Sequence, residues 1–157
     1  LLVRTMQQQK VTPKAIYSVL GGAASSFKFV KEAPESANGI IDCNHWYNPK
    51  DARALALRKR VEAKGLFFTY EIFNTYTAMM YLADAINRAK STDRAAITAA
   101  LTDSTFSDHF MPYGPTKMVN GQNTGAQPLM TQVLGGDIKV IVPREYRQAD
   151  PVFPMKS

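Results

Sequence analysis

Three consecutive amphipathic helices, predicted between Asn48 and Leu101, constrain the fold of this 157-residue chain more than any other feature. Apolar residues recur there at spacings of three and four, which is typical of helices that bury one face. Only four short strands are predicted to cover those faces, at residues 14–20, 39–43, 129–134 and 138–142. So small a sheet covers three helices poorly. We therefore expect an α/β fold whose remaining strands come from residues outside this sequence or from a partner chain.

Capping and turn residues set the predicted boundaries. Asn48-Pro49 predicts the start of the first of these helices, with the proline at the first helical position. Gly65 predicts its end, and a longer helix is expected over residues 69–90. Asn120-Gly121 predicts a hairpin, and Gly135-Gly136-Asp137 a turn between the last two strands.

A glycine loop follows the first predicted strand and precedes a short helix, in the sequence SVLGGAASSF. It lacks the Gly-Lys-Ser/Thr of a phosphate-binding loop and the spacing of a dinucleotide-binding one. Gly21 and Gly22 either supply positive φ to a turn or, with Ala23, face a ligand. Because the loop has no Lys or Arg, its backbone N–H groups and the hydroxyls of Ser25 and Ser26 suit a small neutral or carboxylate ligand better than a phosphate.

An aromatic cluster, His45-Trp46-Tyr47, stands at the end of the second predicted strand. It either packs in the core or forms one wall of a ligand site. The only other histidine, His109, is distant in the sequence, so we expect no metal site. Cys43 is the only cysteine, and its pairing with His45 makes a poor catalytic dyad. We therefore predict no enzyme and no cofactor.

The net charge of +6 has a simple interpretation. The densest basic group lies on one predicted helix and is interleaved with acidic residues, which indicates a solvated face rather than a nucleic-acid surface. No apolar run reaches the roughly 18 residues that a bilayer span requires.

Three stretches together resemble a known family. They are YTAMMYLADAINRAKSTDRAAITAAL, which has a tyrosine-led apolar helix and a short Ser-Thr-Asp-Arg link; MPYGPTKM with NGQNTGAQPLMTQVLGGDIKVIVPREY; and ESANGIID with the following Asn-Pro. In this order they are similar to the late segments of type I periplasmic solute-binding proteins of ABC importers, in particular the branched-chain amino acid and amide group.

The resemblance implies a two-lobed type I fold of two Rossmann-like domains, of which this chain is the C-terminal half. Residues 1–45 are then expected in the C-terminal lobe, 46–124 in the N-terminal lobe, and 125–157 back in the C-terminal lobe. The implied protein is periplasmic and non-enzymatic, and any signal peptide lies in the missing N-terminal half. Its implied partners are an ABC permease and a small ligand such as an amino acid, an amide or an aromatic acid, bound in an interlobe cleft.

The resemblance also places the loop after the first strand at the cleft. Some members carry an acidic residue there for the ammonium group of the ligand, whereas this chain has Gly21-Gly22-Ala23. We predict ligand contacts from these three residues and from His45, Trp46 and Tyr47. The alternative function is a ligand-sensing domain of the same fold in signalling or gene regulation.

Overall fold

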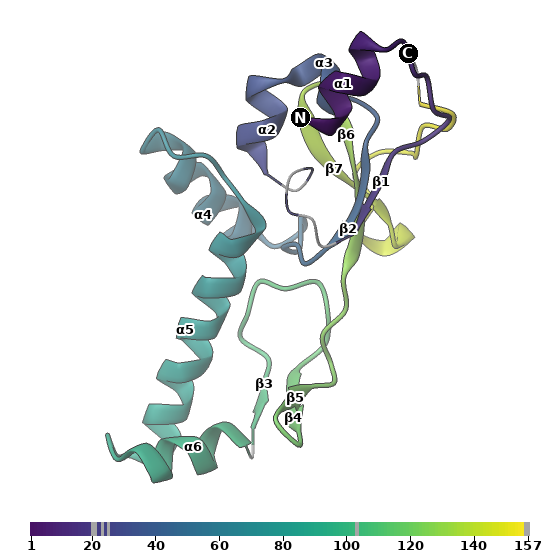
Figure 1. Cartoon of the computed structure of the whole chain (residues 1–157). Coiled ribbons are helices and arrows are strands. Elements are labelled where there is room, and N and C mark those ends of the chain that lie inside the picture. Colours follow the sequence, from purple (N-terminus) through teal and green to yellow (C-terminus); the bar gives the residue numbers. More distant parts are fainter. Residues whose placement is uncertain (20–21, 23, 25, 103, 156–157) are drawn as a thin grey trace.

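The computed structural model describes residues 1–19, 22, 24, 26–102 and 104–155. Helices and strands alternate in the first part of the chain, helices dominate the middle, and strands dominate the end (Figure 1). The elements are α1 (Leu2–Gln8), β1 (Tyr17–Val19), α2 (Phe27–Glu32), α3 (Pro34–Ala37), β2 (Ile41–Asn44), α4 (Ala52–Ala63), α5 (Tyr70–Ala89), α6 (Arg94–Thr102), β3 (Thr105–Phe106), β4 (Thr116–Val119), β5 (Gln122–Asn123), β6 (Leu129–Leu134), β7 (Asp137–Val142) and a 3₁₀ turn, η1 (Arg144–Tyr146).

The main sheet has four strands in the order β1-β2-β6-β7. β1 and β2 run parallel, with Val19 opposite Cys43. β6 is antiparallel to both of its neighbours, and Asn44 at the end of β2 lies opposite Leu129 at the start of β6. β6 and β7 form a hairpin through Gly135 and Gly136, both at positive φ, as the sequence predicts. The expectation of an α/β fold is therefore confirmed.

An aromatic core lies where α2, α4 and the start of α5 meet this sheet. Tyr47 stacks on Phe73 with ring centroids 4.5 Å apart, and Phe68 packs edge-on against Tyr47. The Arg58 guanidinium of α4 lies 4.5 Å from the centre of the Phe27 ring, and its Nη2 donates to Asp137 Oδ1 of β7 at 3.1 Å. α4 is thereby fixed to the main sheet.

The second part of the structure is built on α5 and α6. Figure 1 shows α5 running away from the main sheet and α6 crossing its far end. The Tyr81 hydroxyl of α5 donates to the Leu101 carbonyl of α6. A small antiparallel sheet, β3-β4-β5, lies beside α5. Its β4–β5 hairpin turns at Asn120-Gly121, where both residues have positive φ, as predicted for this dipeptide.

The start of α4 differs from the prediction. Asn48-Pro49 was expected to open this helix, but the structure begins it at Ala52. The Asp51 side chain accepts a hydrogen bond from Arg53 N–H at 2.8 Å and so caps the helix, while Asn48 Oδ1 accepts from Lys50 N–H in a preceding turn. Both sites offer a capping residue, and the local hydrogen bonds select the second.

Apolar surface remains exposed on both parts. On β1, which is the edge strand of the main sheet in the described chain, Tyr17 and Val19 are 53% and 57% exposed. On α5, Tyr76 and Met79 are 40% and 60% exposed, although the helix buries Phe73 and three other side chains on its opposite stripe. These faces are suited to burial against further secondary structure.

Within the described residues, none of the helices combines the length and the apolar character needed to cross a membrane.

Candidate ligand-binding site

Four chain segments converge at the edge of the main sheet where β1 and β2 end. Because these strands are parallel, the loop after β1 and the link after β2 leave at the same edge. β6 enters there, opposite Asn44. The segment before α5 joins them, because Phe27 N–H donates to the Phe68 carbonyl at 3.0 Å and Ser26 forms a bridge with Thr69. In open α/β sheets, ligands bind outside the carboxyl ends of the strands, and this edge is such a position.

The glycine loop is represented here by Gly22; Gly21 and Ala23 lie outside the described residues. Gly22 has a φ of +71°, so it requires the conformational freedom of glycine. A Cβ built on it would lie 3.5 Å from a ring carbon of Tyr70, which places the Tyr70 ring against the loop. The charge of Glu71, followed by partial burial, raises the pKa of Tyr70. A side-chain hydrogen bond with Glu71 contributes to the raised pKa, so the Tyr70 hydroxyl is a neutral donor that Glu71 engages.

A cavity of about 260 Å³ opens beside His45. The half-buried His45 side chain comes from the link after β2, Asn74 and Thr77 from α5, and Tyr113 and Asn123 from the β3–β5 region. The remaining walls are mainly apolar and include two methionines, Met111 and Met118. A mostly apolar space with a few converging polar groups is the usual form of a small-molecule site.

Thr77 gives this cavity a hydrogen-bonding group that is not engaged elsewhere in the described structure. Its side chain is 8% exposed, and its Oγ1 has no hydrogen-bond partner among those residues. Because a buried hydroxyl without a protein partner is costly, the Thr77 hydroxyl is suited to hydrogen-bond with a group that enters this cavity. Across the cavity, Asn123 Nδ2 donates to the Tyr113 hydroxyl at 3.5 Å, and burial raises the pKa of Tyr113.

Trp46 and Tyr47 are placed differently from His45. They are 1% and 0% exposed and belong to the aromatic core, as the packing interpretation of the sequence describes. The Tyr47 hydroxyl accepts a hydrogen bond from Arg58 Nη1 at 3.0 Å, whereas Trp46 Nε1 has no partner in the described chain. The parallel pairing of β1 and β2 therefore puts Gly22 and His45 at the same edge of the sheet, whereas Trp46 and Tyr47 pack in the core. Ligand contact by any of these residues stays a prediction.

Several residues of this site were not identified from the sequence. The sequence pattern places Tyr70 and Thr77 in an amphipathic helix and Asn123 in a hairpin, and it marks none of the three as a site residue. Thr77 interrupts the apolar stripe of α5, and this polar residue on a buried face was the only available signal. In the described part of the chain, no group of three or more His, Cys, Asp or Glu side chains could hold a metal ion.

A family model described as periplasmic binding protein matches residues 1–137, and the chain belongs to this family. The resemblance noted from the sequence is thereby confirmed, as is the expectation of a binding protein rather than an enzyme. No curated protein matches the sequence.

Solved structures support the fold. A branched-chain amino acid ABC transporter protein from Silicibacter pomeroyi is similar over 98% of this chain, with 18% identity and a TM-score of 0.69. A leucine-binding protein from Thermotoga maritima is similar over 88%, with 19% identity and a TM-score of 0.68. A solute-binding protein of R. palustris in complex with benzoate is similar over 94%, with 17% identity and a TM-score of 0.59. The chain covers 43%, 39% and 49% of these structures, so it corresponds to less than half of each type I fold.

Proposed function

We propose that this chain is part of the extracytoplasmic solute-binding component of an ABC transporter. Its ligand is an amino acid, an amide or a related small carboxylate, such as an aromatic acid. The observation that carries the proposal is that the sheet edge where β1 and β2 end holds both the contact between Gly22 and Tyr70 and a small, mostly apolar cavity beside His45. Membership of a binding-protein family supports it.

In this proposal the chain contributes to two lobes. Residues 1–45 and 125–157 belong to one lobe and residues 46–124 chiefly to the other. The contact between Arg58 and Asp137 supports one refinement, because it ties α4 to the main sheet. The chain then crosses between lobes at Phe68–Tyr70 rather than directly after β2.

The remainder of both lobes is supplied by an N-terminal half. The support is the exposed edge of β1 and the exposed face of α5, which both have the character of surfaces that pack against further structure. The ligand lies between the lobes, contacts both of them, and stabilises the closed form through its higher affinity for that form. Closure then signals to an ABC permease at the membrane, and the protein acts in the periplasm.

Ligand binding can be tested by isothermal titration calorimetry of the full-length protein with leucine, valine, benzoate and benzamide. We expect saturable heat with at least one of them. Thr77→Val keeps the shape of the side chain but removes the hydroxyl, and it should weaken binding about tenfold, the loss expected for one hydrogen bond of about 1.4 kcal/mol.

Thr75→Val is the matched control, because Thr75 is exposed on the same helix. It should change the affinity by less than twofold. An absence of heat with all four compounds would contradict the proposed ligand class. Equal effects of the two threonine substitutions on the affinity would show that the cavity beside His45 is not part of the ligand-binding site.

A further inference from the structure

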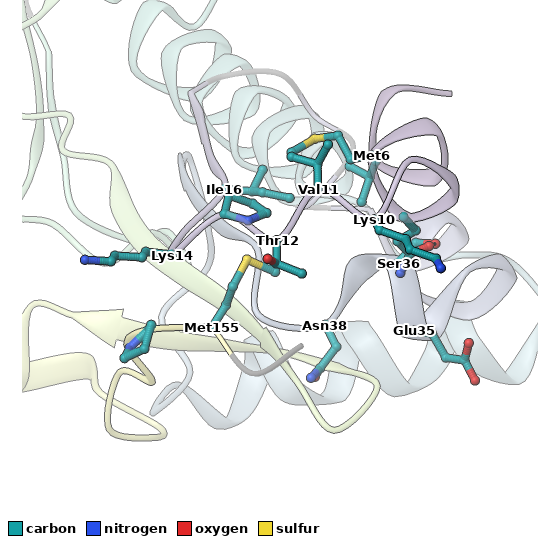
Figure 2. A pocket seen from close by; sticks show the side chains of 14 residues that line it. Met6, Lys10, Val11, Thr12, Lys14, Ile16, Glu35, Ser36, Asn38 and Met155 are labelled. Atoms are coloured by element: carbon teal, nitrogen blue, oxygen red, sulfur yellow. The ribbon is translucent and has the colours of Figure 1, made fainter.

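A larger cavity, of about 650 Å³, lies at the opposite end of the main sheet. It is lined by α1, by residues 10–16 that lead into β1, by α3, and by Pro154–Met155 of the C-terminal tail, and it is open to solvent on one side (Figure 2). Because β1 begins after this link, the cavity lies at the amino end of the strand, away from Gly22 and His45. Its volume is within the range of pockets that bind small molecules.

The centre of this cavity is apolar and adaptable. Figure 2 shows the Met6, Val11, Ile16 and Met155 side chains gathered around it. Methionine is flexible and polarizable, and it is frequent on surfaces that accommodate varied apolar ligands. Such a lining suits an unbranched hydrocarbon chain better than a rigid polar solute.

The tail wall is held in place by specific contacts. Met155 N–H donates to the Lys14 carbonyl at 2.9 Å. Gln132 Nε2 donates to the Val152 carbonyl, and Val152 N–H donates to Gln132 Oε1, both at 2.9 Å. A Cβ on Gly39 would lie only 2.9 Å from Met155 Cβ, so the glycine permits this close approach. This wall of the cavity is therefore fixed by the fold.

One side of the cavity carries hydrogen-bond donors. Ser36, which is 7% exposed, donates its hydroxyl to Gln7 Oε1 at 2.6 Å, and this leaves the Gln7 amide nitrogen as a donor on the wall. Lys10 also lines the cavity, and its backbone has a φ of +55° at the position after α1 where glycine is usual. In Figure 2, Lys10 lies beside Ser36, the partner of Gln7, whereas Lys14 lies on the other side of the cavity and Glu35 extends away from its centre, so Lys10 supplies the positive charge at the Gln7 end.

We propose that this cavity is a second ligand site, distinct from the interlobe site, and that it takes a linear amphipathic carboxylate of the fatty-acid class. The hydrocarbon chain lies among Met6, Val11, Ile16 and Met155. The carboxylate lies at Lys10 and the Gln7 amide, where an ammonium and a neutral donor complement its charge. This inference does not depend on the proposed function, because the two cavities share no residue.

The probe is decanoate, titrated at pH 7 into the full-length protein labelled with ¹³C at the methionine methyl groups. The chain contains seven methionines, which report on different places. The methyl resonances of Met6 and Met155 should shift progressively with decanoate concentration, and the shifts should saturate. Met111 and Met118, which line the cavity beside His45, should not shift, and neither should the exposed Met79.

Two charge-matched variants separate a specific site from general attraction. Lys10→Gln should weaken decanoate binding about fivefold, the size of one partly exposed ion pair. Lys14→Gln removes the same charge from the other side of the cavity, away from Ser36 and Gln7, and it should change the affinity by less than twofold. Decan-1-ol should bind to both variants equally.

Three results would overturn the proposal. The first is that the methyl resonances of Met6 and Met155 do not shift at millimolar decanoate, which is the result expected if another segment of the full-length protein already fills the cavity. The second is equal weakening by both lysine substitutions. The third is a set of shifts confined to Met111 and Met118, which assigns decanoate to the interlobe site.

Discussion

Replacing Arg58 by alanine should destabilise the protein by about 3 kcal/mol. The Arg58 guanidinium donates to the buried Tyr47 hydroxyl at 3.0 Å, to Glu62 at 3.0 Å and to Asp137 at 3.1 Å. Burial lowers the pKa of Arg58, but Tyr47 and the two carboxylates outweigh this effect and raise it. The arginine is therefore charged, and its removal affects every partner.

The expected magnitude follows from the exposure of each partner. Tyr47 is 0% exposed, so its hydroxyl would be left without a partner at a cost of about 1–3 kcal/mol. The stacking of Arg58 on Phe27 adds about 1 kcal/mol. Glu62 and Asp137 are 46% and 30% exposed, so water compensates most of the two ion pairs, which add at most about 1 kcal/mol.

The assay is urea denaturation of a double-mutant cycle with Tyr47→Phe. Without the hydroxyl, Arg58→Ala leaves no orphaned buried group, so its cost should fall by about 1–2 kcal/mol. Arg60→Ala, on the exposed side of the same helix, is the control and should cost less than about 0.5 kcal/mol. Additivity of Arg58→Ala and Tyr47→Phe would refute the argument, because it would show that the buried hydrogen bond contributes nothing measurable.

Three further predictions concern other parts of the molecule. Burial lowers the pKa of His109, whose Nδ1 accepts a hydrogen bond from Met111 N–H, so the folded protein favours the neutral imidazole. The stabilisation from His109 should therefore be complete above pH 6.5, the pKa of an unperturbed histidine, and should decline as the pH falls below that value. The denaturation midpoint should lose this decline in His109→Gln but keep it in His45→Gln. Gly39→Ala should increase the rate of amide hydrogen exchange in the tail at residues 148–155, because the added Cβ displaces Met155. Gly65→Ala is the control, since Gly65 has a similar positive φ but open space around it, and it should leave these rates unchanged. Equal exchange rates in the two variants would contradict the role of the close contact with Met155. This chain alone should self-associate in light scattering through its exposed apolar faces, and a monodisperse monomer would contradict the half-protein interpretation.

Local sequence signals predicted the elements that depend on neighbouring residues. The Asn120-Gly121 and Gly135-Gly136 turns have the expected positive φ, because few other residues adopt that conformation without strain. The apolar spacing over residues 69–90 predicts a helix, because a helix repeats every 3.6 residues, but it does not predict which face is buried: α5 buries Phe73, Thr77, Tyr81 and Ala85, whereas Tyr76 and Met79 are exposed. Where two capping residues compete, as at Asn48 and Asp51, the sequence predicts a helix but not its first residue.

Only the tertiary structure decided which residues share a site. His45 and Thr77 are 32 positions apart, and they meet because the chain leaves β2 at the edge to which the segment before α5 returns. The sequence also left two interpretations open for His45-Trp46-Tyr47, since an aromatic residue after a strand suits both a core and a ligand wall. Packing against Phe68 and Phe73 takes Trp46 and Tyr47 into the core and leaves His45 at the cavity. Local patterns set conformation within a turn or helix, whereas the partners of a side chain depend on contacts between distant segments, which form only when the whole sheet has been assembled.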